Sequence, residues 1–270
     1  MLSVLEKTGA SALASLAFWG ELVRLVFSAT HSSLIVRWRS ARATLRVVAA
    51  QTYFTGWQAM PLVCLLAFVT GCVLVFYTHG QSTPFSGGDM GSTLLYVLVW
   101  RELGPLITGL IVIARSGSAI ASELGNMRAN GETDALQTLA IDPLSFLVFP
   151  RLVAGLISVC CLVIYFDAVA ALGAYLTTAL FTPTSFTGFI AKVIKQVQLE
   201  DLVIIAIKTV LTGTVIFSVS ALFGLRVGKS SHEVPQVTTK AVVTNIVIVT
   251  LLNFLLTGVL LWRHFQGAEL

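Results

Sequence analysis

The chain has 270 residues, of which 56% are hydrophobic and 11% are charged, and its mean hydropathy is +0.88. Soluble domains carry about 25% charged residues, so the composition excludes a water-soluble fold and predicts an all-α polytopic membrane protein. The formal net charge of +4 comes from Lys and Arg residues confined to particular loops, which is not the clustering that a nucleic-acid-binding surface shows.

Residues 1–50 are interpreted as N-terminal amphipathic helices at the membrane interface, because charged residues recur among apolar neighbours there. The basic ones after residue 30 are Arg37, Arg39, Arg42 and Arg46. A cleaved signal peptide is the competing interpretation, since Lys7 precedes an apolar run. The acidic Glu6 and the later arginines argue against it, so we expect this segment to remain on the mature protein.

Five apolar stretches are each long enough to cross a hydrocarbon core of about 30 Å. We expect them at residues 60–78, 93–122, 146–181, 199–225 and 241–262. Gly104, Pro105 and Gly109 predict a bend in the second, and the length of the third predicts a tilt or a projection. Residues 182–188 are expected to form a turn, and residues 189–198 an amphipathic segment.

The distribution of basic residues predicts the orientation of the chain. The loop at residues 79–92 has no Lys or Arg, which favours the periplasmic side, whereas Arg226, Lys229 and Lys240 favour the cytoplasm for the last loop. Lys192 and Lys195 weaken this bias without reversing it. We therefore expect a cytoplasmic N-terminus and a periplasmic C-terminus.

A series of short motifs resembles one known family. It comprises RELGP at residues 101–105, GSAIASELGNMR at 117–128, TDAL at 133–136 and DP at 142–143. Together they resemble the MlaE (YrbE) permeases, subunits of ABC transporters that move phospholipids or related lipids with Mce-domain proteins. The similarity extends from residue 51 to residue 243. Two departures are Asn253, where the family commonly has an acidic residue, and the segment at residues 234–236.

The resemblance implies one permease domain over residues 51–270 in the inner membrane of a Gram-negative bacterium. Its implied partners are a second copy of the chain, a cytoplasmic ABC ATPase dimer, a hexameric Mce-domain protein, a STAS-domain protein and phospholipid. The GLRVGKS segment at residues 224–230 has one residue too few for a phosphate-binding loop and follows an apolar helix. No cofactor is therefore expected in this chain, and ATP and Mg²⁺ would be bound by the partner ATPase.

Among the charged residues inside the predicted spans, we single out Arg101 and Glu102 in the second, Asp167 in the third and Lys208 in the fourth. A charge at the bilayer centre costs about 2.5–3.5 kcal/mol, so these groups should face one another or a hydrated cavity. Our hypothesis is an outward lipid cavity in which Arg101 and Lys208 contact a lipid phosphate, held by Glu102 and Asp167. A purely structural network of ion pairs is the alternative.

Two further sets of residues have expected roles. Gly104 and Pro105, together with Gly117, Ala121 and Gly125 at a spacing of four, predict close helix packing. The resemblance implies that residues 131–141 form a coupling helix that contacts the ATPase, and a solvated loop helix is the alternative. The residues assigned to this contact are Arg128, Glu132, Asp134, Ala135 and Leu136.

No catalytic or metal site is expected. The four cysteines lie in apolar stretches without metal-ligand spacing, and the four histidines are scattered over termini and loops. Two other functional classes remain as alternatives to the permease. An intramembrane lipid-modifying enzyme would explain the buried charges, and a passive scaffold or channel would need no ATPase.

Overall fold

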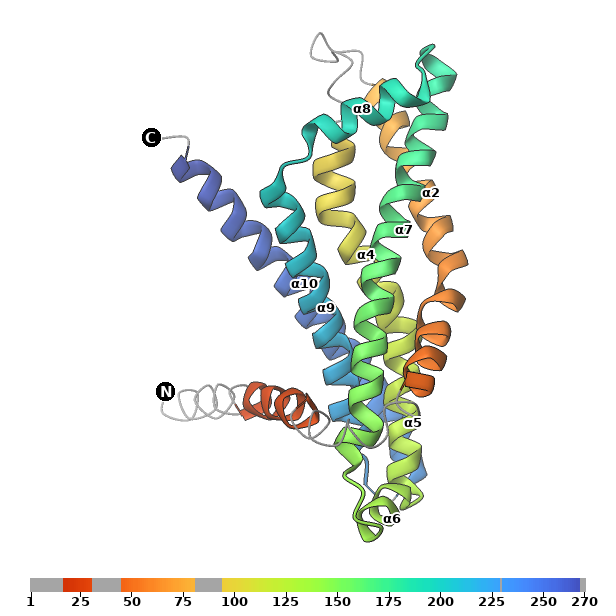
Figure 1. Ribbon diagram of the computed structural model, residues 1–270, viewed down its shortest axis with the longest axis vertical. Coiled ribbons are helices and arrows are strands. Elements are labelled where there is room, and N and C mark those ends of the chain that lie inside the picture. Colours follow the sequence, from red (N-terminus) through yellow and green to blue (C-terminus); the bar gives the residue numbers. More distant parts are fainter. Residues whose placement is uncertain (1–16, 31–44, 81–93, 229, 268–270) are drawn as a thin grey trace, which may run out of the picture.

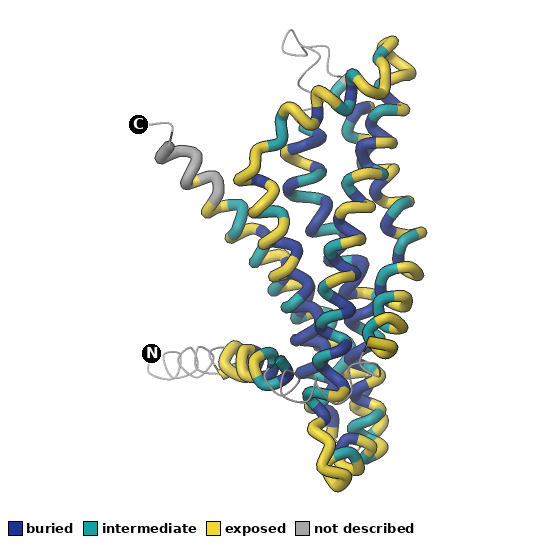
Figure 2. The backbone as a smooth tube through the Cα atoms, in the orientation of Figure 1, coloured by how far each residue is buried: buried dark blue, intermediate teal, exposed yellow. Residues whose placement is uncertain are grey.

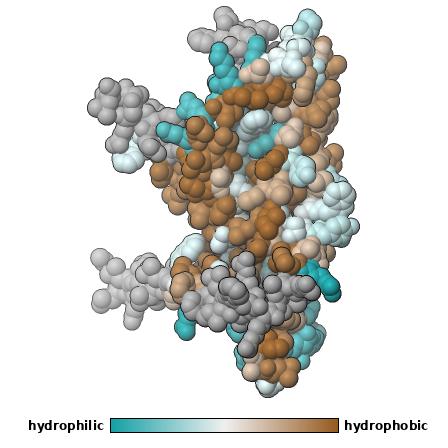
Figure 3. Space-filling model, in the orientation of Figure 1, coloured by the Kyte–Doolittle hydropathy of each residue, from teal (hydrophilic) through white to brown (hydrophobic). Residues whose placement is uncertain are grey.

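The computed structural model describes residues 17–30, 45–80, 94–228 and 230–267, and within these ranges the chain is helical with short connections and no strand. Five helices are long and apolar enough to cross a membrane, which confirms the predicted number of spans. They comprise Leu45–Thr78, Leu95–Ala129, Leu144–Phe181, Leu199–Leu225 and Ser231–Val259. Figure 1 shows them as an elongated bundle, and hydrophobic residues cover much of its visible face in Figure 3.

The first two spans are built from several helical segments. The first contains the 3-10 turn η1 (Trp57–Ala59) and the α-helix α2 (Met60–Gly80). The second begins with a π-helix, η2 (Leu95–Leu103), and continues through α4 (Gly104–Val112), a second π-helix η3 (Ile113–Gly117) and α5 (Ser118–Ala129). The bend expected near Gly104 therefore takes the form of a change from π- to α-helical geometry.

The rest of the chain adds three long helices and two short ones. The short helix α6 (Glu132–Thr138) forms the tip of the bundle that lies farthest from α8 in Figure 1. The third span is η4 (Leu144–Val148) followed by α7 (Phe149–Phe181), and α8 (Phe186–Gln196) leads into α9 (Leu199–Leu225). The 3-10 turn η5 (Ser231–Glu233) precedes α10 (Val234–Gly267).

Two predicted boundaries are wrong. Helix α8 begins at Phe186, inside the expected turn, because the Ser185 hydroxyl caps it by accepting a hydrogen bond from the Gly188 amide at 3.2 Å. Helix α10 begins at Val234 rather than at residue 241. Pro235 is its second residue, a position where the missing N–H costs no helical hydrogen bond.

Helix α7 lies at the centre and packs against α2, α4 and α9. Its closest contact is with α2, where a side chain at Gly71 would collide with the backbone of Ala170, and one at Gly173 would lie 2.5 Å from the Phe68 carbonyl oxygen. The core therefore runs along the inner faces of these helices, as the buried residues in Figure 2 show.

The N-terminal helix over residues 17–30 lies across the bundle axis in Figure 1. It contacts the end of α9, because the rings of Phe18 and Phe223 lie 6.1 Å apart and Glu21 forms an ion pair with Arg226. Residues 1–16 and 31–44, including three of the predicted interfacial arginines, lie outside the described ranges. An interfacial role for residues 1–50 stays a prediction.

Candidate functional site

The charged residues of the second span lie on the π-helix η2, just before Pro105. Proline has no N–H, so Pro105 cannot donate a helical hydrogen bond to the Arg101 carbonyl four residues earlier. The Lys208 ammonium, from α9, donates to this carbonyl at 3.3 Å instead. The irregular backbone at Gly104 and Pro105 thus creates an acceptor that a buried cation uses, and π-helical segments occur frequently at functional sites.

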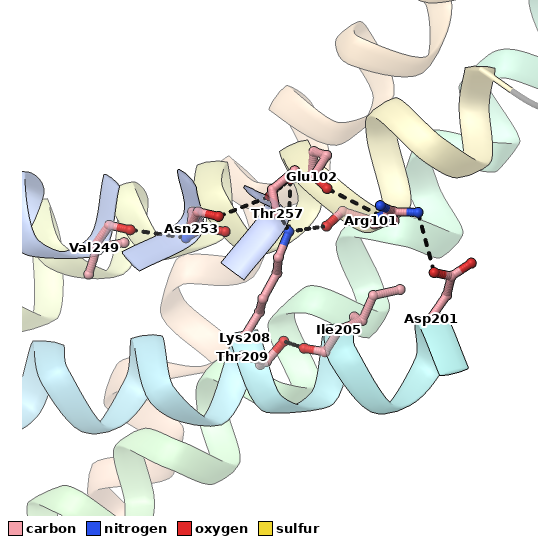
Figure 4. Close-up of polar contacts among 9 residues, drawn as sticks. All are labelled: Arg101, Glu102, Asp201, Ile205, Lys208, Thr209, Val249, Asn253 and Thr257. Carbon is pink, nitrogen blue, oxygen red and sulfur yellow. Dashed lines mark hydrogen bonds and ion pairs between the residues drawn. The ribbon is translucent and has the colours of Figure 1, made fainter. Parts of the chain in front are cut away.

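Lys208 is fully buried and has no unused donor. Besides the Arg101 carbonyl, its ammonium group donates to Glu102 Oε2 at 2.8 Å and to Thr257 Oγ1 at 2.9 Å. A lysine ammonium has three N–H donors, and these three acceptors satisfy all of them. Thr257 also donates to Glu102 Oε2 at 2.6 Å, so η2, α9 and α10 meet at one point (Figure 4).

Arg101 is bound less completely than Lys208. One terminal nitrogen donates to Asp201 Oδ1 at 3.3 Å, and the Tyr96 hydroxyl donates to the other oxygen of Asp201 at 2.9 Å. The Arg101 Nε lies 3.4 Å from Glu102 Oε1, but no hydrogen bond forms there, and this Nε has no other acceptor within the described residues. A guanidinium has five N–H donors, and within the described residues the Arg101 side chain donates one hydrogen bond, to Asp201.

These four charged residues, Arg101, Glu102, Asp201 and Lys208, form what we call the charge cluster, and their charges sum to zero. Glu102 is its most accessible member, with a side chain 25% exposed, compared with 9% for Arg101, 6% for Asp201 and 0% for Lys208. At 1.5 Å per residue, Lys208 lies roughly 14 Å along α9 from its start, and Asp201 roughly 3 Å. The cluster therefore occupies the half of the bundle near α8.

Asp167 lies apart from the charge cluster, although we expected it to hold one of the two cations. Its backbone carbonyl accepts a hydrogen bond from Trp100 Nε1 at 3.0 Å, but its Oδ1 atom has no partner within the described part of the chain. A side chain at Gly104 would lie 2.5 Å from that oxygen. The glycine thus leaves room for the carboxyl group, and Asp201 takes the place expected for Asp167.

Asn253 lies one turn before Thr257 on α10 (Figure 4). Its side-chain amide donates to the Val249 carbonyl at 3.2 Å, and its backbone carbonyl lies 2.9 Å from Thr257 Oγ1, whose one O–H is shared between this carbonyl and Glu102. The side-chain oxygen of Asn253 has no partner among the described residues. The position where the resembled family commonly has an acid therefore borders the charge cluster but adds no charge to it.

The predicted small-residue positions of η3 and α5 face α9 and the residues that follow it in the same chain. A side chain at Gly117 would lie 3.1 Å from Ser220 Oγ, and one at Gly224 would lie 2.9 Å from the Ala121 carbonyl oxygen. A side chain at Gly125 would lie 3.0 Å from Val227, just after α9, and 3.4 Å from Val234 at the start of α10. The sequence alone left open whether the partner helix belongs to the same chain or to a second copy, and the structure shows that it belongs to the same chain.

The short helix expected within residues 131–141 is α6, and the left-handed backbone of Gly131, with φ of 77°, turns the chain into it. Arg128 forms an ion pair with Asp134 and donates to Thr133 Oγ1 at 3.1 Å. Leu136 packs against the core, while Glu132 and Ala135 are exposed. Arg128 and Asp134 therefore bind each other and fix α6 to α5.

Sequence reasoning missed three members of the site. Asp201 lies in the first turn of α9, where an acidic residue is ordinary, and Tyr96 and Thr257 carry no charge. The charges considered from the sequence already included two carboxylates, Glu102 and Asp167, for the two cations, so a count of charges gave no signal for Asp201. Near α6, the exposed Leu139 was also missed.

Most of the chain is similar to known proteins. The model of the family described as Permease MlaE matches residues 48–259. A probable ABC transporter permease protein of Rickettsia typhi is 32% identical over 80% of this chain and 83% of its own length. The intermembrane phospholipid transport system permease protein MlaE of Haemophilus influenzae is 28% identical over 79% of this chain and 82% of its own length.

A further relative is a chloroplast protein of a plant. The protein TRIGALACTOSYLDIACYLGLYCEROL 1, chloroplastic, of Arabidopsis thaliana is 32% identical over 76% of this chain and 58% of its own length. The family match extends from the helix before α2 into the outer half of α10, and it includes every member of the charge cluster and all of α6. The chain therefore belongs to the MlaE permease family.

Proposed function

We propose that this chain is the membrane subunit of an ATP-driven transporter that moves phospholipid between the inner membrane and periplasmic Mce-domain proteins. The name of the Haemophilus influenzae relative, which refers to intermembrane phospholipid transport, supports the substrate class. The Rickettsia relative is called an ABC transporter permease, which supports coupling to a separate ATPase. The lipids moved would serve outer-membrane lipid asymmetry or lipid uptake.

The observation that carries this proposal is the unequal satisfaction of the two buried cations. All three N–H donors of Lys208 have acceptors within the protein, so its role is to join η2, α9 and α10. Within the described residues the terminal nitrogens of Arg101 donate one hydrogen bond, to Asp201, so N–H groups on them remain for a ligand, and guanidinium groups bind phosphate oxygens in pairs. Arg101 is therefore the group that contacts the lipid phosphate, and Glu102, the most accessible member of the cluster, lines the same cavity.

Coupling to the ATPase is assigned to α6 and the residues after it. Glu132, Ala135 and Leu139 are exposed at the tip of the bundle, and Leu139 is 70% exposed although it is apolar. An exposed apolar side chain beside an acidic one suits a protein partner. The ion pair between Arg128 and Asp134 would transmit movement of α6 to α5 and so to the second span.

We assign the exposed face of α10 to the contact with a second copy of the chain. Only 17% of the most apolar part of the last span is buried within one chain, compared with 50% or more in the second, third and fourth spans. In Figure 1 the C-terminal half of α10 diverges from the bundle. Two chains joined here would enclose a cavity that opens toward a hexameric Mce-domain protein, with the C-terminus periplasmic and the N-terminus cytoplasmic. A STAS-domain protein would bind on the ATPase side.

Co-purification tests the proposal. The tagged chain is expressed with the products of its neighbouring genes and purified in mild detergent. We expect an ATPase and an Mce-domain protein to co-purify together with bound phospholipid, and Arg101→Gln to lose the lipid while keeping both proteins. A chain that purifies alone and without lipid would support the enzyme or scaffold alternative.

A further inference from the structure

A groove between α2 and α4 has features of a second lipid site, separate from the charge cluster. It has a volume of about 570 Å³, within the range of pockets that bind small molecules. Its walls are apolar except at one end, where the Arg115 side chain lies. The lining residues are Leu62, Leu66, Ile107, Leu110, Ile111, Ala114 and Arg115.

Arg115 differs from the other arginines that the bundle holds in place. Arg101, Arg128, Arg151 and Arg226 each pair with a carboxylate. Arg115 instead donates to two neutral oxygens, Gln58 Oε1 at 2.6 Å and the Phe54 carbonyl at 3.3 Å. Within the ranges that the structure describes it has no carboxylate partner. Its positive charge is therefore fixed in position but not neutralised.

The depth of Arg115 matches the level of lipid headgroups. Arg115 lies twenty residues after Leu95, where the second span begins, and Gln58 lies twenty residues before Thr78, where the first span ends. At 1.5 Å per residue both distances are about 30 Å, the thickness of the hydrocarbon core. Tyr53, Phe54 and Trp57 are exposed beside them, and Tyr and Trp are enriched at membrane interfaces.

The groove runs from Arg115 toward the middle of the membrane. Ile107 lies eight residues before Arg115 on one wall, and Leu66 lies eight residues after Gln58 on the other, so each wall extends roughly 12 Å. One leaflet contributes about half of the hydrocarbon core, or about 15 Å. The groove therefore has the length of most of one acyl chain, with a cation at the depth of its phosphate.

We propose that this groove binds one phospholipid of the leaflet on the α6 side, with an anionic headgroup at Arg115 and an acyl chain between α2 and α4. The unused N–H groups of Arg115 would donate to the phosphate oxygens, and basic groups at this depth attract anionic lipids. The site is separate from the lipid cavity proposed at Arg101, because the two arginines lie fourteen residues apart along the second span, roughly 21 Å at 1.5 Å per residue.

Photo-crosslinking tests the site. The full chain, with the subunits that co-purify with it, is reconstituted in vesicles of phosphatidylcholine and phosphatidylglycerol, with a diazirine on one acyl chain of either lipid. We expect phosphatidylglycerol adducts on the peptides that contain Leu62, Leu66 and Leu110, and weaker labelling by the phosphatidylcholine probe. Equal labelling by the two probes would overturn the assigned role of Arg115.

Matched variants separate the groove from the rest of the protein. Arg115→Gln and Leu66→Trp should each lower the phosphatidylglycerol adducts several-fold, and the second leaves the hydrogen bonds of Arg115 in place. Arg101→Gln should leave groove labelling at the wild-type level even where it abolishes transport. Unchanged labelling in both groove variants, or efficient cross-linking of Leu66→Cys to a second copy, would show that no lipid occupies the groove.

Discussion

Lys208 is a buried lysine whose role can be deduced from its donors. Its three hydrogen bonds go to three acceptors from η2 and α10, and none remains for a ligand. Our initial hypothesis gave Lys208 and Arg101 the same role, because hydropathy shows only that a charge is buried. The geometry separates them, because it shows which N–H groups already have acceptors.

Removal of the Lys208 charge should destabilise the protein strongly. Lys208→Met leaves Glu102 without its closest cation, and the loss of one partner of a buried pair costs about 3–5 kcal/mol. Thermal unfolding in detergent, followed by tryptophan fluorescence, should therefore show a large drop in melting temperature. Lys195→Met, on an exposed lysine of α8, should stay close to the wild type.

A double-mutant cycle checks that this cost comes from the pair. Glu102→Gln in the Lys208→Met background removes the unpaired carboxylate, so the double variant should be more stable than the sum of the single effects predicts. Strictly additive effects would mean that Glu102 and Lys208 do not interact as the structure describes.

Three of the four members of the charge cluster could be predicted from the sequence. Arg101, Glu102 and Lys208 stand out because charges are costly within apolar stretches. Asp201 lies in the first turn of a helix, where acidic residues are common, and Thr257 carries no charge. Neither can be recognised until the helices are placed beside one another, because their role depends on contacts between α9, α10 and η2.

At the scale of elements, the closest helix contact is between α2 and α7. The pattern at Gly117, Ala121 and Gly125 predicted a close contact, which the structure places against α9. The closer contact at Gly71 and Gly173 went unnoticed, because neither residue has another glycine four positions away on its helix. Hydropathy predicted the five spans that the structure shows. The π-helical segments have no comparable signal in the sequence.

Gly71→Ala should therefore lower the stability of the protein far more than the same substitution at a glycine with no close neighbour. Its methyl group would collide with the Ala170 backbone, which cannot move without shifting α7. We expect a destabilisation of about 1–3 kcal/mol or more, visible as a lower melting temperature. Gly258→Ala on α10 is the matched control, since nothing lies within 4 Å of the added carbon. Equal stability of the two variants would contradict the α2–α7 contact.

Helix α6 and the residue Leu139 carry the proposed contact with the ATPase. Leu139→Glu should abolish co-purification of the ATPase, because it places a charge in an apolar contact. The permease itself should keep its wild-type melting temperature, since Leu139 is exposed. Gln137→Ala, on an exposed neighbour, serves as the control. Retention of the ATPase by the Leu139 variant would place the contact elsewhere.

At the scale of the whole molecule, one chain leaves a face of α10 largely uncovered. Exposed apolar side chains follow this helix at Val243, Val247, Leu251, Phe254 and Leu255. Lipid covers such a face in a monomer, whereas a second copy covers it in the proposed dimer. The composition of one chain could not distinguish these two arrangements, because a lipid-facing and a protein-facing surface are equally apolar in a membrane.

Cysteine cross-linking distinguishes them. In a background from which the four native cysteines are removed, Leu251→Cys should form a disulfide-linked dimer in native membranes. Leu176→Cys, on an exposed part of α7, should not. Cross-linking at α7 but not at α10 would move the proposed dimer interface to another face of the bundle.

The central claim is that Arg101 contacts a lipid phosphate while Lys208 holds the helices together. The most direct measurement is ATP-dependent transfer of fluorescent phospholipid between proteoliposomes that contain the complete transporter and the Mce-domain acceptor. We expect Arg101→Gln to abolish transfer while the complex remains assembled and the ATPase remains active. Transfer at the wild-type rate by Arg101→Gln would contradict the claim and leave the charge cluster with a structural role alone.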